Sequence, residues 1–392
     1  MANVYQAAPI VNDVVAELYG AKTASQIQTD GFVSLGKMVL SSTDNVDAFY
    51  SKIYDRIALT VFSVRPFEVQ KRSVRRNDIE WGAIVQKIIV KTGEAVDNPS
   101  WVSSTQANPF DVEIKDEVVV KMFKKIATYT YEDSIPRTQL FTAFTSESAM
   151  DSFVSSIYVN MANELEMAAA GLDNLAVATN MAYVLKNGKS AQKRNLLSEY
   201  CTLKGIDITT LADINVAFQN ADFLKYCAVE IGKTVKNIQS PSTIFNVDGI
   251  KRQTRGDNLV VEVNSGYIAA TEAYLEADTY HNELVKLPNY EEIPYWQYSG
   301  ESFSLDDTTE INVKYADDDD SDNSFEVQVA GILAFVHDRE SCASIITNRR
   351  TSTIYNPRAE RLNVFEKADK GYAVDGSENA VVFYAAAYEN IN

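Results

Sequence analysis

A long stretch without proline, from Thr145 to Asn187, limits the possible folds more than any other part of the sequence. Along it, apolar residues recur every three or four positions, the spacing of one face of an α-helix. Thr145 or Ser146 can cap its start, and Asn187-Gly188 supplies a stop. The pattern therefore predicts one helix of about 40 residues and roughly 60 Å. Its apolar positions are Met150, Phe153, Val154, Ile157, Tyr158, Met161, Leu165, Ala168, Leu172 and Leu175.

Before this helix, from about residue 63 to 125, the apolar spacing changes to alternate residues. Glu80–Lys91 is rich in β-branched residues, and Val118–Phe123 predicts a returning strand. Between them, Glu94–Pro109 is polar and turn-rich around Trp101. We therefore expect a long β-hairpin. In a monomer, such a hairpin and a solitary long helix would both expose apolar surface unless neighbouring copies cover it.

The remaining segments predict a mixture of helices and short strands. Residues 1–30 are polar and indicate an N-terminal arm, and 44–62 has helical spacing. Further on, helices are expected at Ile206–Cys227 and Ala269–Leu284, and strands at Leu259–Val263, Phe325–Phe335 and Ala380–Tyr384.

The charge of the chain argues against general nucleic-acid binding. The net charge is −18, and residues 262–340 hold 19 acidic against 3 basic residues, including the run Asp317–Asp320. Contact with phosphates needs clustered Lys and Arg, so this acidic block is expected to be a solvated surface. The longest apolar run is Ala380–Tyr388, whereas a membrane helix needs about 18 residues or more. We expect no membrane span and no signal peptide.

Residues for catalysis or metal binding are few, because the chain has 2 His and 3 Cys without a CxxC pair. Gly31–Lys37 fits a phosphate-binding loop, but Met38 stands where that loop needs Ser or Thr. Asp318, Asp320 and Asp322 resemble the start of a calcium loop, yet Val329 holds the place of its last carboxylate. We predict no catalytic residue, no cofactor and no metal ligand, and no catalytic role for either histidine.

One dense basic cluster, Lys71, Arg72, Arg75 and Arg76, lies at the base of the expected hairpin. It can be an electrostatic contact with an acidic neighbouring subunit, or a solvated strand edge that its charge protects from aggregation. Both interpretations stay open at this point. Candidate residues for an intersubunit contact are Lys71, Arg72, Arg75, Arg76, Trp81 and Trp101.

Three stretches resemble major capsid proteins of tailed bacteriophages, in particular the short-tailed group. The first is Asn246–Pro294, with Val247–Thr254 and Leu259–Val263 within it. The second is Ala330–Asp338 with Ile354–Pro357. The third runs from Asn363 through Asp375–Phe383.

The resemblance implies the α+β fold of the Hong Kong 97 type and a non-enzymatic shell protein. It would divide the chain into an N-terminal arm (1–62), an extended loop (63–125), a peripheral domain with the spine helix (126–200), an axial domain (201–340) and a return to the peripheral domain (341–392). It implies self-assembly into hexamers and pentamers of an icosahedral head, with scaffolding and portal proteins and packaged DNA as partners. The expected location is the virion, after assembly in the host cytoplasm.

Two other classes remain open at this stage. An encapsulin-type bacterial compartment shell would share the fold, and a virion tail or surface-adhesion protein would share the structural role. An enzyme ranks last, because the sequence lacks the common hydrolase motifs.

Overall fold

The computed structural model describes 73–76, 85–90, 118–123, 126–139, 147–275, 290–296, 309–315, 325–387 and 390–391, with isolated residues before position 53. Several expectations fall outside these residues. They include most of the N-terminal arm with its 44–62 helix, the hairpin tip around Trp101, and the acidic run Asp317–Asp320.

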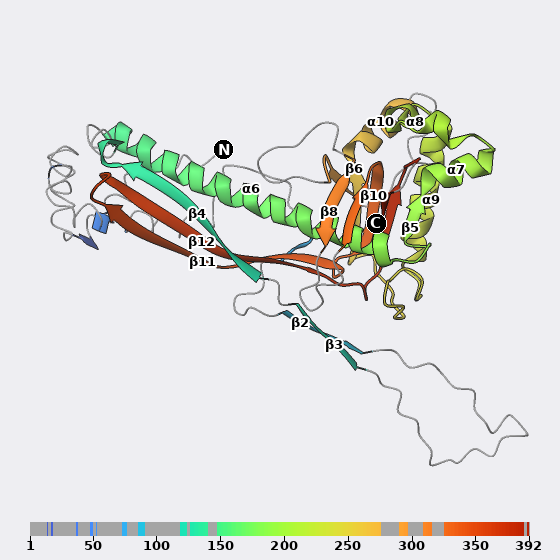
Figure 1. The fold of residues 1–392 in the computed structure, drawn as a ribbon, viewed down its shortest axis with the longest axis horizontal. Coiled ribbons are helices and arrows are strands. Elements are labelled where there is room, and N and C mark those ends of the chain that lie inside the picture. Colours follow the sequence, from blue (N-terminus) through green and yellow to red (C-terminus); the bar gives the residue numbers. More distant parts are fainter. Residues whose placement is uncertain are drawn as a thin grey trace, which may run out of the picture.

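The predicted long helix is α6, Glu147–Asn187, which is continuous over 41 residues. Gly188 follows it, where a Cβ would clash with the carbonyl oxygen of Val184. At about 1.5 Å per residue the helix is roughly 60 Å long. Figure 1 shows it running from one end of the molecule into a compact body at the other. We call it the spine helix.

A long sheet accompanies the first part of the spine helix (Figure 1). Its strand order is β1-β11-β12-β4. Alternate β12 residues, such as Leu362, Val364 and Ala368, are buried, and their neighbours are half-exposed. This period of two is expected where only one face of a sheet is covered. The bounds are Arg75–Arg76 (β1), Cys342–Asn356 (β11), Arg361–Val374 (β12) and Ile126–Pro136 (β4).

The compact body is built on a second sheet, in the order β5-β13-β10-β6-β7. Its central strands β10 and β13 are buried throughout, since both faces are covered. The bounds are Lys193–Asn195 (β5), Ala380–Tyr384 (β13), Ile332–Asp338 (β10), Leu259–Asn264 (β6) and Tyr290–Ile293 (β7).

Each face of this second sheet contributes to a separate core. One core includes Phe223, Ile231 and Phe383 and lies under short helices. The other includes Met181 of the spine helix, with Phe335 and Trp296. The helices are α7 (Leu196–Lys204), η2 (Ile208–Leu211), α8 (Ile214–Phe218), α9 (Ala221–Asn237) and α10 (Ser265–Leu275). A small sheet, β14-β9-β8, borders the second core, with bounds Asn390–Ile391 (β14), Phe325–Val329 (β9) and Ile311–Tyr315 (β8).

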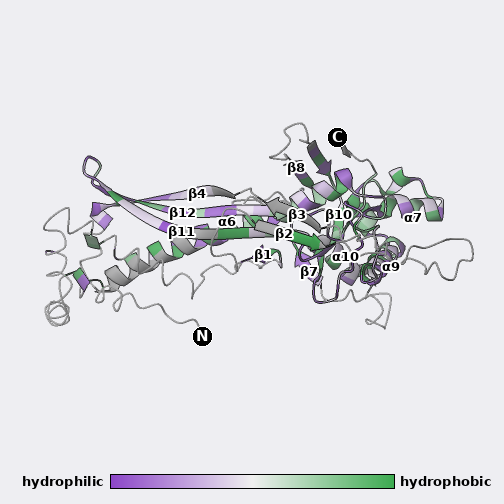
Figure 2. Ribbon diagram, turned by 90° about the horizontal axis from the view of Figure 1, so that it is seen from below, coloured by the Kyte–Doolittle hydropathy of each residue, from purple (hydrophilic) through white to green (hydrophobic). Residues whose placement is uncertain are grey.

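The predicted hairpin is present as β2, Val85–Val90, paired antiparallel with β3, Val118–Phe123. Within the described residues, these two strands form a sheet of their own. Figure 1 shows them leaving the compact body, and Figure 2 shows that much of β2 is apolar.

Four details differ from the sequence-based expectations. The helical segment expected at Ile206–Cys227 is divided into η2, α8 and α9, and α9 continues to Asn237. The run Phe325–Phe335 divides into β9 and β10, because Gly331 adopts a positive φ of 76° between them. Helix α10 begins at Ser265, before the expected Ala269, and the expected end lies outside the described residues. Strand β13 pairs with β10 and so joins the sheet of the compact body, not the long sheet that β11 and β12 form.

Candidate functional site: the roots of the extended hairpin

Arg75, at the start of the segment that leads into the hairpin, contacts the spine helix. Its Nε donates to Asp173 Oδ2 at 2.9 Å, and its Nη1 lies 3.2 Å from Glu166 Oε1. The Nη2 atom lies 2.7 Å from Asp173 Oδ2. All three side chains are almost fully buried, with at most 7% exposed. The hydroxyl of Ser344 in β11 donates to the other Asp173 oxygen, which joins β11 to this contact.

The charge of Arg75 is therefore used inside the subunit. Burial lowers the pKa of Arg75, but hydrogen bonding and the negative charges of Asp173 and Glu166 outweigh it and raise the pKa. This corrects the expectation that Arg75 contacts a neighbouring subunit or lies on a solvated edge. Both interpretations require an exposed charge, and this guanidinium is enclosed between β1 and the spine helix.

Arg76 is the one other described member of the predicted contact set. Its Nη2 donates to the backbone oxygen of Arg339 at 3.1 Å, and it keeps partial exposure. Lys71, Arg72, Trp81 and Trp101 lie outside the described residues. For Arg76 and these four residues, the intersubunit contact stays a prediction.

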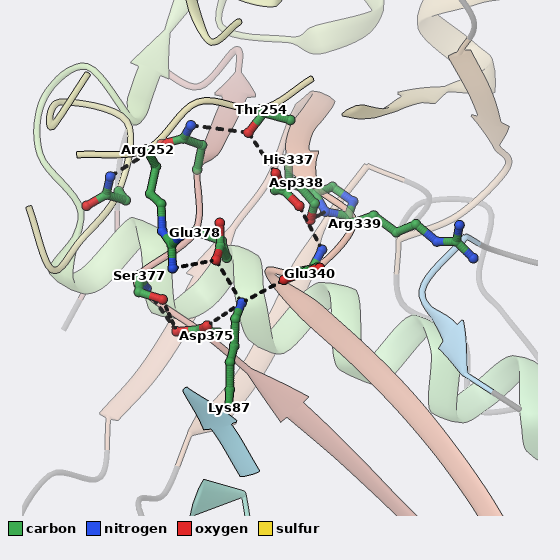
Figure 3. Close-up of polar contacts among 12 residues, drawn as sticks. Lys87, Arg252, Thr254, His337, Asp338, Arg339, Glu340, Asp375, Ser377 and Glu378 are labelled. Atoms are coloured by element: carbon green, nitrogen blue, oxygen red, sulfur yellow. Dashed lines mark hydrogen bonds and ion pairs between the residues drawn. The ribbon is translucent and has the colours of Figure 1, made fainter. Parts of the chain in front are cut away.

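Lys87, in β2, inserts its ammonium group among three carboxylates at the surface of the compact body (Figure 3). Its Nζ lies 2.8 Å from Glu378 Oε1, 2.9 Å from Asp375 Oδ2 and 3.2 Å from Glu340 Oε2. The Asp375 and Glu378 side chains are 3% and 8% exposed, and that of Glu340 is 54% exposed. We call these three acids the Lys87 socket.

The socket is shaped by a tight turn between β12 and β13. The backbone N–H and the hydroxyl of Ser377 donate to Asp375 Oδ1 at 3.0 and 2.7 Å, an arrangement that aspartate favours in turns. The N–H of Asp375 donates to the carbonyl oxygen of Ser341 at 2.7 Å. At Gly376 a Cβ would fall 2.7 Å from the ring of Tyr183, so the turn lies directly against the spine helix.

Further polar contacts within the compact body support the socket (Figure 3). Arg252 Nη2 lies 3.1 Å from Glu378 Oε1. The amide of Asn379 donates to Thr254 Oγ1 at 3.2 Å, and that hydroxyl donates to Asp338 Oδ2 at 2.9 Å. Thr254, Asp338 and Asn379 are each at most 4% exposed, and neither of these two hydrogen bonds involves Lys87.

The acids of the socket outnumber the basic groups that contact them, and the pKa values reflect this. Burial lowers the pKa of Lys87, but Asp375 and Glu378 raise it more, so the ammonium stays charged. Burial raises the pKa of Glu378 by more than Lys87 and Arg252 lower it. Burial likewise raises the pKa of Asp338. One ammonium shared among three carboxylates is well stabilised, whereas each carboxylate receives only part of its charge.

The three resembling stretches of the sequence meet at this socket. Arg252 and Thr254 come from the first, Asp338 from the second, and Asp375, Glu378 and Asn379 from the third. The sequence resemblance covers these segments but implies no role for the socket residues. In the sequence, these polar residues lie directly beside apolar patterns typical of strands. Such a pattern could have indicated that the ends of several strands meet at one polar site.

The remaining candidates for chemistry are enclosed. His337 Nδ1 lies 2.9 Å from both the Asp338 carbonyl oxygen and the Ser341 hydroxyl, and its ring stacks on Phe335. All three cysteines are buried free thiols, and burial raises the pKa of Cys227 well above its usual range. Among the described residues, no group of His, Cys, Asp and Glu is arranged to hold a metal ion. No described helix has the length and hydropathy of a membrane span.

Comparison with known proteins identifies the family. The model of the Phi29-like phage major capsid protein family matches residues 10–384, almost the whole chain. The chain belongs to this family. Its role as a structural capsid protein and its place in the virion follow from that membership. The spine helix, the hairpin and the two sheets are the α+β elements expected of the Hong Kong 97-type fold, which confirms that expectation.

Solved phage capsid structures are also similar to the chain. The capsid of Staphylococcus phage Andhra shares 9% identity over 83% of this chain and 86% of that chain, with a TM-score of 0.47. The capsid of cyanophage P-SCSP1u shares 8% identity over 84% and 95%, with a TM-score of 0.44. No curated protein matches. The family assignment therefore rests on the family model.

Proposed function

We propose that this capsid protein assembles with copies of itself into the hexamers and pentamers of an icosahedral head that encloses double-stranded DNA. The observation that carries the proposal is the hairpin. It forms a sheet separate from the rest of the described chain, and Ile88 on it is 63% exposed. A neighbouring copy is the natural cover for such a surface, because an exposed apolar strand invites association.

The partners follow from the chemistry of a DNA-filled shell. We expect scaffolding and portal proteins to guide assembly in the host cytoplasm, and we expect DNA to be retained without sequence-specific contacts. A net charge of −18 supports weak contact with DNA, since phosphates repel acidic surfaces. Family membership favours this reading over an encapsulin or an adhesion protein, and it favours a structural over an enzymatic role.

For the domains, we propose a peripheral unit around β4, β11, β12 and the adjoining half of the spine helix. The axial unit would contain the compact body. Strand β13 belongs to the axial unit in this scheme, because it pairs with β10 and not with β12.

The test is electron microscopy and sedimentation of the expressed protein, alone and with candidate scaffolding genes. We expect capsomers or closed shells of hexamers and pentamers at micromolar concentration. A monomer under every condition, scaffold included, would overturn the proposal. A shell filled with enzyme cargo instead of DNA in particles from infected cells would support the encapsulin alternative.

A further inference from the structure

The two strands of the hairpin are attached to the subunit in different ways. Strand β3 ends at Phe123, and β4 begins at Ile126, so two residues of backbone connect it to the long sheet. Strand β2 follows β1 after the eight residues 77–84, and the ion pairs of Lys87 with its three carboxylate partners attach it to the compact body. The backbone link is therefore short beside β3 and longer beside β2, where the ion pairs of Lys87 add a reversible attachment.

Both attachments meet at the same end of β12. Ile126 pairs with Gly371, and Asp375 of the Lys87 socket lies just beyond the end of this strand at Val374. Strand β2 also buries Ile89, which is 1% exposed. Apolar packing is non-directional, whereas three ion pairs to side chains at a hydrogen-bonded turn fix the position of one atom.

We propose that Lys87 is a clamp that sets the direction in which the hairpin leaves the subunit. Without its charge, the hairpin swings about the short link between β3 and β4 while the compact body stays folded. The inference rests on the proposed function, in which one sequence occupies both hexamers and pentamers and its hairpin must reach neighbours at different angles. A reversible ionic attachment beside a short backbone link provides that freedom.

The socket can lose Lys87 without the collapse of its surroundings. Its turn is held by Ser377, Ser341 and the network behind it, none of which involves β2. Glu340 is already half-exposed, so the socket lies at the surface. When β2 moves away, water can reach the carboxylates that Lys87 covered. The effect is therefore local to the hairpin.

The test measures the distance between the hairpin and the body in the unassembled subunit. Spin labels are attached at Val118→Cys, at the far end of β3, and at Val229→Cys, a position in α9 that is 54% exposed. The three native cysteines are buried and do not compete for the label. From the β3–β4 link to Val118 is about 20 Å of strand, so a swing of about 30° moves the label by about 10 Å.

We expect a narrow distance distribution in the parent protein and one broadened by about 10 Å in Lys87→Met. Lys87→Arg keeps the cation and should restore the narrow distribution. Lys251→Met, which removes an exposed lysine next to Arg252 in the sequence, is the matched control and should change nothing. Glu340→Gln with Glu378→Gln removes two of the three partners without touching β2, and it should broaden the distribution in the same direction.

An unchanged distribution in Lys87→Met overturns the clamp. If Lys87→Met loses its helical circular dichroism, the glutamine double variant decides, and an unchanged distribution there also overturns the proposal. The measurement does not need assembly. A broadened distribution in a protein that never forms shells would refute the proposed function and leave the clamp standing. Normal shells with no broadening in Lys87→Met would refute the clamp and leave the proposed function standing.

Discussion

Replacing Arg75 by methionine should destabilise the subunit severely. The substitution keeps much of the side-chain volume but removes the Arg75 cation from beside Glu166 and Asp173. These two side chains are 7% and 2% exposed. Breaking a buried ion pair by removing one partner costs about 3–5 kcal/mol, because the remaining charge stays buried and uncompensated. A natural domain has about 5–15 kcal/mol in total.

The assay is urea unfolding of the unassembled subunit, followed by helical circular dichroism. With a urea dependence of about 1–3 kcal/mol per molar, a loss of this size lowers the midpoint by about 1–2 M or more. Arg75→Lys keeps the charge but lacks the planar guanidinium that pairs with two acids. Its urea midpoint should therefore fall between those of the parent protein and Arg75→Met.

A triple variant separates charge burial from lost packing. Arg75→Met with Glu166→Gln and Asp173→Asn leaves no charge behind, and neutral replacement of a whole buried pair is often close to harmless. The triple variant should recover most of the lost stability. A wild-type midpoint for Arg75→Met, or a triple variant no better than the single one, would refute the reasoning. Arg75→Glu with Arg76→Glu should accordingly fail to fold, a stronger defect than poor assembly of a folded subunit.

Two further substitutions test other parts of the subunit. Ile157→Asp places a carboxylate on the spine helix where the parent side chain is 5% exposed, which costs several kcal/mol of stability. We expect insoluble or proteolysed protein on expression. A soluble variant that assembles normally would show that this face of the helix is not part of the core. Glu378→Gln should be as stable as the parent protein or more stable at about pH 7, with the difference closing toward about pH 4. The sign follows from the raised pKa of Glu378: its contribution to stability is fully present below the ordinary carboxyl pKa and is lost as pH rises through the raised value. Urea midpoints across that range check it, and a parent protein that loses less stability than the variant toward neutral pH would contradict it.

Elements whose pattern is local could be predicted from the sequence. The spine helix, the two hairpin strands and the strand at Ala380–Tyr384 all lie where the spacing of apolar residues places them. The division at Gly331 was not visible, because a positive φ leaves no mark in a run of apolar residues. The partner of β13 was not visible either, since pairing between distant strands depends on the whole topology.

The site was harder to predict for the same reason. Arg75 belongs to a basic cluster that looks solvated in sequence, and its acidic partners follow 91 and 98 residues later. Lys87 stands 291 residues before Glu378. A charge pattern shows that such groups exist, but only the folded chain shows which opposite charges are enclosed together.

The unbroken spine helix also restricts how the gene can change in length. One part of it packs against β11 and β12, and a later part packs against β8, β9 and β13. Inserting one residue between these parts would rotate everything beyond it by about 100° and pull one set of contacts away from its strands. Insertions or deletions of about 7 or 11 residues return the packed face of the helix to within about 20° of its original direction. Relatives should therefore vary freely in loop length but differ within this helix only in such steps.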